Sequence, residues 1–204
     1  MAAKKIDAIW HLTAPLTDAD VVELRAGDKV LFQGVMLTGR DAAHKRMIDT
    51  LAKGEMLPVE LKGQVLYYVG PSATKPGMAI GSAGPTTGGR MDKWSPRLLE
   101  ADIGLKAMIG KGGRNKGVID ALVKHKGLYL ASTGGAGALL ARAIVKAEIV
   151  AYEDLGAEAI RRLEVKDFPC VVVNDTTGRD LYAENLAAFR DPSLGPPPPP
   201  STGE

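Results

Sequence analysis

The 204-residue sequence contains one cysteine, few aromatic residues and almost no net charge. A single cysteine excludes a disulfide framework and any zinc or iron–sulfur site built from this chain's own cysteines. The apolar neighbours of Cys170 predict a buried thiol on a strand. A formal net charge of +2 and an aromatic content of 5% argue against a nucleic-acid-binding surface.

Long apolar segments are also missing. No run approaches the roughly 20 residues of a membrane-spanning helix, and residues 1–5 lack the apolar core of a signal peptide. We therefore expect a soluble, cytoplasmic protein. The length and a hydrophobic content of 45% indicate one globular domain, placed at residues 1–190. Residues 191–204 include five consecutive prolines, and we expect them to form a disordered tail.

The order of apolar patterns predicts a mixed α/β fold. Alternation over residues 6–12 predicts one half-buried strand, and the apolar stretch 29–37 predicts a strand, or a pair of strands, kinked at Gly34. Thr38 is expected to cap the helix that follows, and residues 171–182 are expected to form a hairpin. Strands that cluster early and alternate with helices later indicate an α/β layered domain.

The loop 84–92, with the sequence GPTTGGRMD, is the most informative stretch. Its glycines let backbone N–H groups approach an anion closely, and Arg90 can form two parallel hydrogen bonds with a carboxylate or phosphate. Thr86 and Thr87 place two hydroxyls near that arginine. The Gly-Pro start alone is also typical of an ordinary turn.

Two further cations have comparable settings. Arg40 falls in the expected first turn of a helix, where free N–H groups and the dipole already favour anions. Lys111 lies between glycines, from which its side chain can project into a cavity. One such cation is commonly a solvated surface charge, but three together suit a substrate with two carboxylates. On the same helix, Asp41 is expected to cap the helix and hold Arg40 or the loop, and His44 follows Arg40 by one turn.

The other glycine-rich segments give little support for a nucleotide site. Residues 110–113 lack the spacing and the Ser/Thr of a Walker A loop, and residues 134–138 do not match the dinucleotide fingerprint. We expect residues 134–138 to allow a helix to pack closely on the preceding strand.

Taken together, these segments resemble the β subunit of two-subunit class I fumarases and L(+)-tartrate dehydratases, which is equivalent to the C-terminal domain of single-chain class I fumarases. The matching segments occur in the family order across about residues 5–190: 24–28, 38–44, 84–92, 109–112, 134–136 and 165–169. The departures are Gly137, where the family usually has alanine, and the proline-rich tail.

The resemblance implies a swivelling β/β/α three-layer domain that closes over a four-iron, four-sulfur cluster. The family's cluster cysteines belong to the other subunit or domain, so the cluster would be carried by an α subunit, in an α2β2 hetero-oligomer. The implied reaction is the reversible addition or removal of water on a short dicarboxylate, with fumarate/malate slightly favoured over tartrate. The alternative is a stand-alone dicarboxylate-binding module without catalysis.

The resemblance also assigns roles to residues. Thr86 would lie at the carbon that gains or loses a proton, as the base itself or as a relay. A threonine hydroxyl is a poor base in water, so this role requires a dry, cationic pocket. The carboxylate-binding side chains would be Arg40, Thr87, Arg90 and Lys111. The supporting side chains around them would be Asp41, His44 and Asp92. No residue of this chain is expected to bind a metal.

Overall fold

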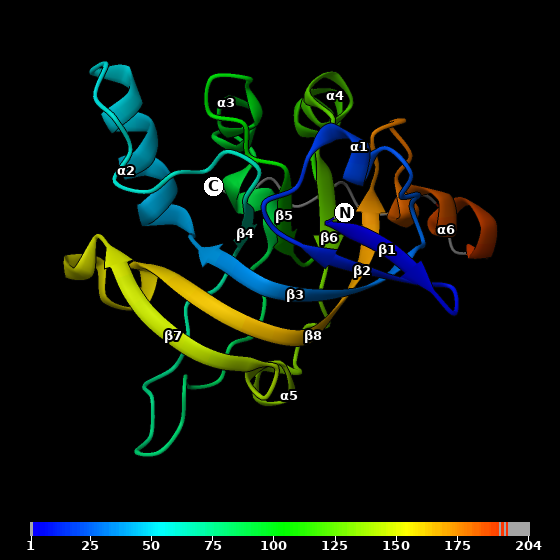
Figure 1. Cartoon of the computed structure of the whole chain (residues 1–204). Helices are drawn as coiled ribbons and strands as arrows, with labels where there is room; N and C mark the ends of the chain where they lie inside the picture. The colour runs from blue at the N-terminus through cyan, green and yellow to red at the C-terminus, as the bar shows by residue number, and fades with distance from the viewer. Residues whose placement is uncertain (1, 192, 194, 196–204) are drawn as a thin grey trace.

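The computed structural model describes residues 2–191, 193 and 195. Within them, eight strands form one sheet in the order β1-β2-β3-β4-β5-β6-β8-β7, and β8 also pairs with β3 (Figure 1). The strands are β1 (Ala3–Ile6), β2 (Ile9–Thr13), β3 (Lys29–Thr38), β4 (Val65–Tyr67), β5 (Ala107–Gly110), β6 (Leu128–Ala131), β7 (Ile144–Ala151) and β8 (Ile160–Asn174). The α-helices are α1 (Asp18–Val21), α2 (Asp41–Ala52), α3 (Ser95–Leu99), α4 (Lys116–His125), α5 (Gly137–Ala141) and α6 (Leu181–Phe189). Two 3₁₀ helices are η1 (Gly88–Met91) and η2 (Glu153–Glu158).

The first strand is split in two. β1 pairs antiparallel with β2 across a turn at Asp7 and Ala8, whose φ angles are +47° and +66°. The single strand expected over residues 6–12 is therefore wrong. Alternation of apolar residues gave no sign of the reversal because neither turn residue is the glycine that such φ angles favour.

β3 bends in the middle and joins two parts of the sheet. Its first half runs parallel to β2, and its second half runs parallel to β4, with Leu37 opposite Leu66. The register against β8 shifts between Phe32 and Gly34, where Gly34 has a φ of +82°. The kink expected at Gly34 is confirmed, and it turns the carboxyl end of β3 toward β4.

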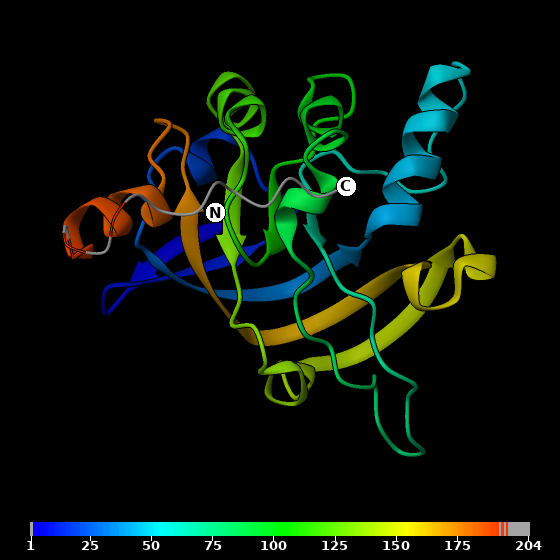
Figure 2. The same cartoon turned by 180° about the vertical axis from the view of Figure 1, so that it is seen from behind.

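Side chains of the parallel strands β4, β5 and β6 alternate between two hydrophobic cores. Tyr67 and Ile109 face a core shared with β2, β3 and β8. Leu66 and Met108 face a second core that contains residues of α2, α3 and α4. Both views show these three helices on the same side of the strands, with β7 and β8 sweeping across the other (Figures 1 and 2). The mixed α/β fold is confirmed, and the carboxyl ends of β3, β4 and β5 lie together.

The chain after β8 forms a helix instead of a hairpin. The Asp175 carboxylate accepts the N–H groups of Thr177 at 2.8 Å and Ala26 at 2.9 Å, which fixes a turn directly after the strand. Asp180 then accepts the N–H of Tyr182 at 2.9 Å and caps α6. Asn174 forms a single antiparallel bridge with Asp180 across this turn. The second strand of the hairpin expected over 171–182 is wrong, because Asp180 caps a helix there.

Cys170 lies buried on β8, as expected, and burial raises the pKa of its thiol. Among the helices of the described residues, none combines the length and the apolar character needed to cross a bilayer. The tail expected over 191–204 lies outside the described residues except at positions 191, 193 and 195.

Candidate active site

Three loops at the carboxyl ends of parallel strands bring the predicted site residues together. Arg40 follows β3, Lys111 follows β5, and the loop 84–92 lies between the ends of β4 and β5. The Thr86 N–H donates to the Tyr68 carbonyl at 2.7 Å, and the Lys111 N–H donates to the Thr86 carbonyl at 3.1 Å. Ligands of α/β proteins commonly bind at this end of parallel strands. Main-chain hydrogen bonds therefore fix Thr86 directly beside Lys111.

Arg40 begins α2 in a different way from the one expected. It is itself the N-cap residue, with an extended backbone at φ −135°, and the helix begins at Asp41. Thr38 remains in β3, where its hydroxyl donates to the Ala159 carbonyl at 3.2 Å and accepts the Arg161 N–H at 2.8 Å. The expected Thr38 cap is wrong because the amino end of β8 supplies partners for that hydroxyl.

Asp41 holds two arginines from separate loops. The Arg90 Nε donates to Asp41 Oδ1 at 2.9 Å, and the Arg40 Nε lies 3.4 Å from Asp41 Oδ2. Partial burial would raise the pKa of Asp41, but its own N–H, Arg90 and Arg40 outweigh this and hold the pKa below its usual value. The contact that the sequence suggested between Asp41 and Arg40 is present, and Arg90 shares it.

Glu158, which the sequence gave no reason to select, secures the other side of Arg40. It ends η2, between β7 and β8, and its Oε1 lies 3.3 Å from Arg40 Nη2. Its Oε2 accepts the Ala42 N–H at 2.7 Å, at the start of α2. Gly70 closes the third side, since a Cβ there would lie 2.6 Å from Arg40 Nη1. The guanidinium of Arg40 is therefore held by three segments.

His44 supports Arg40 from inside the protein. It is fully buried, and its Nδ1 lies 2.9 Å from the Arg40 carbonyl, so Nδ1 carries the proton and donates. The ring also packs against Trp94 and Tyr68. Burial lowers the pKa of His44 to about 4, although the Arg40 carbonyl acts against this. A neutral His44 thus fixes the backbone of Arg40, whereas the sequence left open whether it faces the site itself.

Lys111 is the most available cation of the three. Its side chain is exposed and lies along Gly134, where a Cβ would be 3.3 Å from Lys111 Cδ. Among the described residues it takes part in no ion pair within 4.0 Å. Thr86 is half-buried and Thr87 is exposed. A ligand can therefore reach Lys111 and both threonines.

Gly137 packs against the loop 84–92. A Cβ at Gly137 would lie 2.9 Å from the Gly84 nitrogen and 2.5 Å from Ser82 Oγ. The close packing expected of residues 134–138 is present here, but the contact at Gly137 is with this loop. The sequence could not show this contact because the loop lies far from α5 along the chain.

Asp92 lies beneath the loop and pairs with Arg114, which the sequence analysis did not select. Its Oδ1 accepts from Arg114 Nε at 2.6 Å, and its Oδ2 accepts the Asn115 N–H at 2.7 Å. The side chain of Arg114 has 0% exposure. The supporting role expected of Asp92 is thus toward a buried cation, and the position of Arg114 shortly after Lys111 was the available signal.

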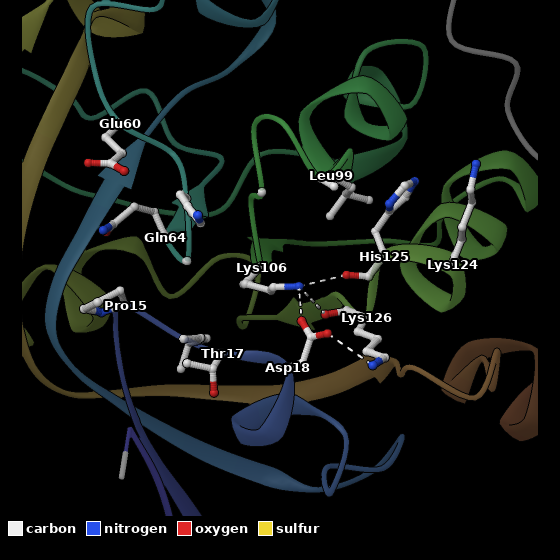
Figure 3. A pocket seen from close by; sticks show the side chains of 15 residues that line it. Pro15, Thr17, Asp18, Glu60, Gln64, Leu99, Lys106, Lys124, His125 and Lys126 are labelled. Carbon is white, nitrogen blue, oxygen red and sulfur yellow. Dashed lines mark hydrogen bonds and ion pairs between the residues drawn. The ribbon is translucent and has the colours of Figure 1, made fainter.

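A large cavity lies at the opposite end of the strands. It has a volume of about 800 Å³ and is lined by residues that precede β4 and β5, among others (Figure 3). Lys106 donates to Asp18 Oδ1 at 2.6 Å and to the His125 carbonyl at 2.9 Å, and Lys126 also pairs with Asp18. None of the predicted site residues lines this cavity.

A metal cofactor does not fit the described residues of this chain. Within the described part of the chain, no group of three or more His, Cys, Asp or Glu side chains could hold a metal ion. The one cysteine, Cys170, is buried on β8. A cluster held by cysteine thiolates would need cysteines other than Cys170.

Comparison with known proteins gives the family. Residues 2–185 match the model described as the fumarase C-terminus. The chain belongs to the fumarase C-terminus family. This match covers nearly all of the residues that the structure describes, and it includes every residue discussed above as part of the site.

The relatives of this fumarase C-terminus chain include fumarate hydratases and a tartrate dehydratase subunit. It is 41% identical to fumarate hydratase 2 of Leishmania major over 79% of this chain and 28% of that protein. It is 40% identical to the aerobic class I fumarate hydratase of Escherichia coli K12, over 81% of this chain and 30% of that protein. It is 35% identical to a putative L(+)-tartrate dehydratase subunit beta of Methanocaldococcus jannaschii, over 83% of this chain and 89% of that protein. The chain thus matches less than a third of these two fumarate hydratases and most of the β subunit.

Proposed function

We propose that this chain is the β subunit of a hydro-lyase that reversibly adds water to, or removes it from, a short dicarboxylate. The observation that carries the proposal is the convergence of Arg40 and Arg90 on one carboxylate, Asp41, beside the hydrogen-bonded pair Thr86 and Lys111. Relatives named fumarate hydratase and tartrate dehydratase subunit beta support this class of reaction.

The cations would bind the two substrate carboxylates. Arg90 uses its Nε for Asp41, which leaves its two terminal nitrogens for a substrate carboxylate. Lys111 would take the second carboxylate, and the exposed Thr87 hydroxyl would add a hydrogen bond. Arg40 would bind alongside Arg90, in an orientation set by Asp41 and Glu158. Hydrogen bonds between charged partners are about twice as strong as neutral ones, which favours a dianion here.

Thr86 would act at the carbon that gains or loses the proton, which is one of the two carbons between those carboxylates. Hydration places a hydroxyl on one carbon of a double bond and a proton on its neighbour, and dehydration removes both. The Thr86 hydroxyl is the group of this chain that we assign to moving that proton. The nearby positive charge of Lys111 and Arg90 would lower the pKa of the hydroxyl, provided that water is excluded.

A second polypeptide would complete the site. The Methanocaldococcus relative is named as a β subunit, and the fumarate hydratases extend well beyond the matched region. We propose an α subunit in an α2β2 assembly, with a four-iron, four-sulfur cluster held entirely by that subunit. The present chain would close over the partner as a swivelling β/β/α layer, and closure would exclude water from Thr86.

Fumarate/malate and tartrate both present two carboxylates to the same cations. We place fumarate/malate first and tartrate second. Malate and tartrate differ by one hydroxyl. Relative kcat/KM values of the assembled enzyme would rank the two substrates.

The test is anaerobic co-expression with an α-type partner from the same genome, followed by rate measurements on fumarate, malate and L(+)-tartrate. Reversible hydration or dehydration by the complex, and none by either chain alone, supports the proposal. A chain that binds dicarboxylates tightly without a partner, and gives an inactive complex, would instead be a stand-alone binding module. Failure to form any complex would overturn the proposed subunit role.

A further inference from the structure

A buried guanidinium, that of Arg114, binds the end of the loop 84–92 and is linked through Tyr129 to the Lys111 carbonyl. We propose that Arg114 is a positioning residue that holds the loop 84–92 and Lys111 in one fixed arrangement. The catalytic part of this inference rests on the proposed hydro-lyase function, whereas the structural part can be tested without activity.

Arg114 is a fully enclosed cation with specific partners. Its side chain has 0% exposure, and Nε donates to Asp92 Oδ1 at 2.6 Å. Its Nη2 donates to Ser95 Oγ at 2.7 Å. The guanidinium carbon also lies 4.7 Å from the ring centre of Tyr129 and 5.5 Å from that of Tyr68. A buried charge is costly unless every partner is in place, so this geometry is well defined.

The first connection runs from Arg114 to the loop with Arg90. Asp92 ends this loop, and its N–H donates to the Gly89 carbonyl at 3.2 Å. Ser95, held by Arg114 Nη2, donates to the Met91 carbonyl at 2.9 Å. The guanidinium therefore anchors the carboxyl end of η1 at two points, directly behind Arg90.

The second connection runs to Lys111 through an aromatic side chain. Tyr129 lies against the Arg114 guanidinium, and its hydroxyl donates to the Lys111 carbonyl at 3.1 Å. The same carbonyl accepts the Gly88 N–H at 2.8 Å. Close approach is built into this layer, because a Cβ at Gly110 would lie 2.8 Å from the Tyr129 hydroxyl oxygen.

These two connections link one buried charge to the loop 84–92 directly and to Lys111 through Tyr129. Arg114 does not reach the solvent, so it cannot bind substrate in this arrangement. Neutral apolar residues of similar volume often stabilise a protein as well as a buried ion pair does. We therefore assign to the pair of Arg114 and Asp92 the role of fixing the geometry of the loops.

The decisive variant is the double substitution Arg114→Met/Asp92→Asn. It removes both charges together, and the new amide oxygen can still accept the Asn115 N–H. We expect a melting temperature within a few degrees of the wild type. We also expect amide hydrogen exchange in peptides covering 86–92 and 111–115 to rise at least about 10-fold, and kcat/KM of the complex to fall about 100-fold, as a misplacement on the order of 1 Å can produce.

The matched control is Lys116→Met/Asp120→Leu, which removes an exposed ion pair on the adjoining helix. We expect it to leave loop exchange and kinetics unchanged. Loop exchange and kcat/KM that match the wild type in a folded double variant would overturn the proposal.

If the double variant does not fold, Arg114→Lys decides. It keeps the charge but loses the planar, two-sided hydrogen bonding of a guanidinium. Raised exchange in 86–92 and 111–115 would support the proposal, and unchanged exchange would overturn it. If the wild-type complex has no hydro-lyase activity while these exchange changes occur, the proposed function fails and the positioning role of Arg114 stands.

Discussion

Two lysines at opposite ends of β5 show how differently one strand can use the same charge. Lys106, before the strand, has a side chain that is 15% exposed and is bound by Asp18 and the last carbonyls of α4. Lys111, after the strand, is exposed and, in the described part of the chain, has no ion-pair partner. The large cavity surrounds Lys106, yet the available charge is at Lys111 (Figure 3). Free charge on converging loops identifies the candidate site better than the size of a hollow does.

The largest expected effect comes from a comparison of two threonines, Thr86 at the carboxyl ends of the parallel strands and Thr17 near their amino ends. Thr86→Ala should lower kcat of the complex about 10³-fold with little change in KM, because loss of a proton-transfer group typically costs 10²–10⁴-fold. Steady-state kinetics and dicarboxylate binding by calorimetry would check this. Near-normal turnover would remove Thr86 from the mechanism.

The matched change is Thr17→Ala, beside the large cavity. Thr17 caps α1, where its hydroxyl contacts Asp20 at 2.6 Å. Its loss should cost about 1 kcal/mol of unfolding free energy and leave kcat unchanged. A large loss of kcat in this variant would contradict the assignment of the site to the other end.

The second comparison substitutes the two lysines themselves. Lys111→Met should lower kcat/KM about 10²-fold, on the scale of other lost stabilising donors. Lys106→Met should leave kcat/KM within about two-fold and lower the unfolding free energy by about 1 kcal/mol, since its partner Asp18 stays half exposed. Equal kinetic effects of both changes would show that the two ends are not functionally distinct.

The third prediction concerns the buried histidine behind Arg40. Burial holds the pKa of His44 at about 4 in the folded chain, below its usual value of about 6.5. The unfolded chain therefore binds more protons between these values. Stability should fall by about 3 kcal/mol as the pH drops from about 6.5 to 4.

Urea unfolding across this pH range would measure the effect in the wild type and in His44→Asn. The asparagine amide can still donate to the Arg40 carbonyl but does not titrate. Its stability should therefore vary less with pH. Parallel curves for the two proteins would show that His44 is not the group responsible.

The smallest expected effect tests Glu158. Glu158→Gln keeps an oxygen that can accept the Ala42 N–H but removes the negative charge near Arg40. We expect KM to rise about 3-fold with kcat nearly unchanged, as for the loss of a partly exposed ion pair worth up to about 1 kcal/mol. Glu60→Gln, at the large cavity, should change neither. A fall in kcat without a change in KM would contradict a role in orienting Arg40.

The sequence predicted local features well where their cause was local. The kink at Gly34 and the buried position of Cys170 on a strand follow from a glycine and from apolar neighbours, and both are present. The split at Asp7 and Ala8 and the start of α6 at Leu181 were missed. Neither the reversal at Asp7 and Ala8 nor the capping of α6 by Asp180 produces a periodic pattern of apolar residues.

The candidate site divides in the same way. Arg40, Arg90 and Lys111 could be selected from the sequence because glycine, a helix start and a charge are close neighbours along the chain. Glu158 could not be selected, and the pairing of Asp92 with Arg114 could not be foreseen, because the fold brings together segments that are distant along the chain.

By itself, the sequence determined which loops carry cations and hydroxyls, and its resemblance indicated the family that the comparison then showed. Only the tertiary structure decided which of those charges stay free. Lys106 directly precedes β5 and Lys111 directly follows it, so in the sequence both are lysines at the end of the same strand. Their difference arises because Asp18 and the end of α4 fold onto one end of β5, while the loops at the other end leave their lysine exposed.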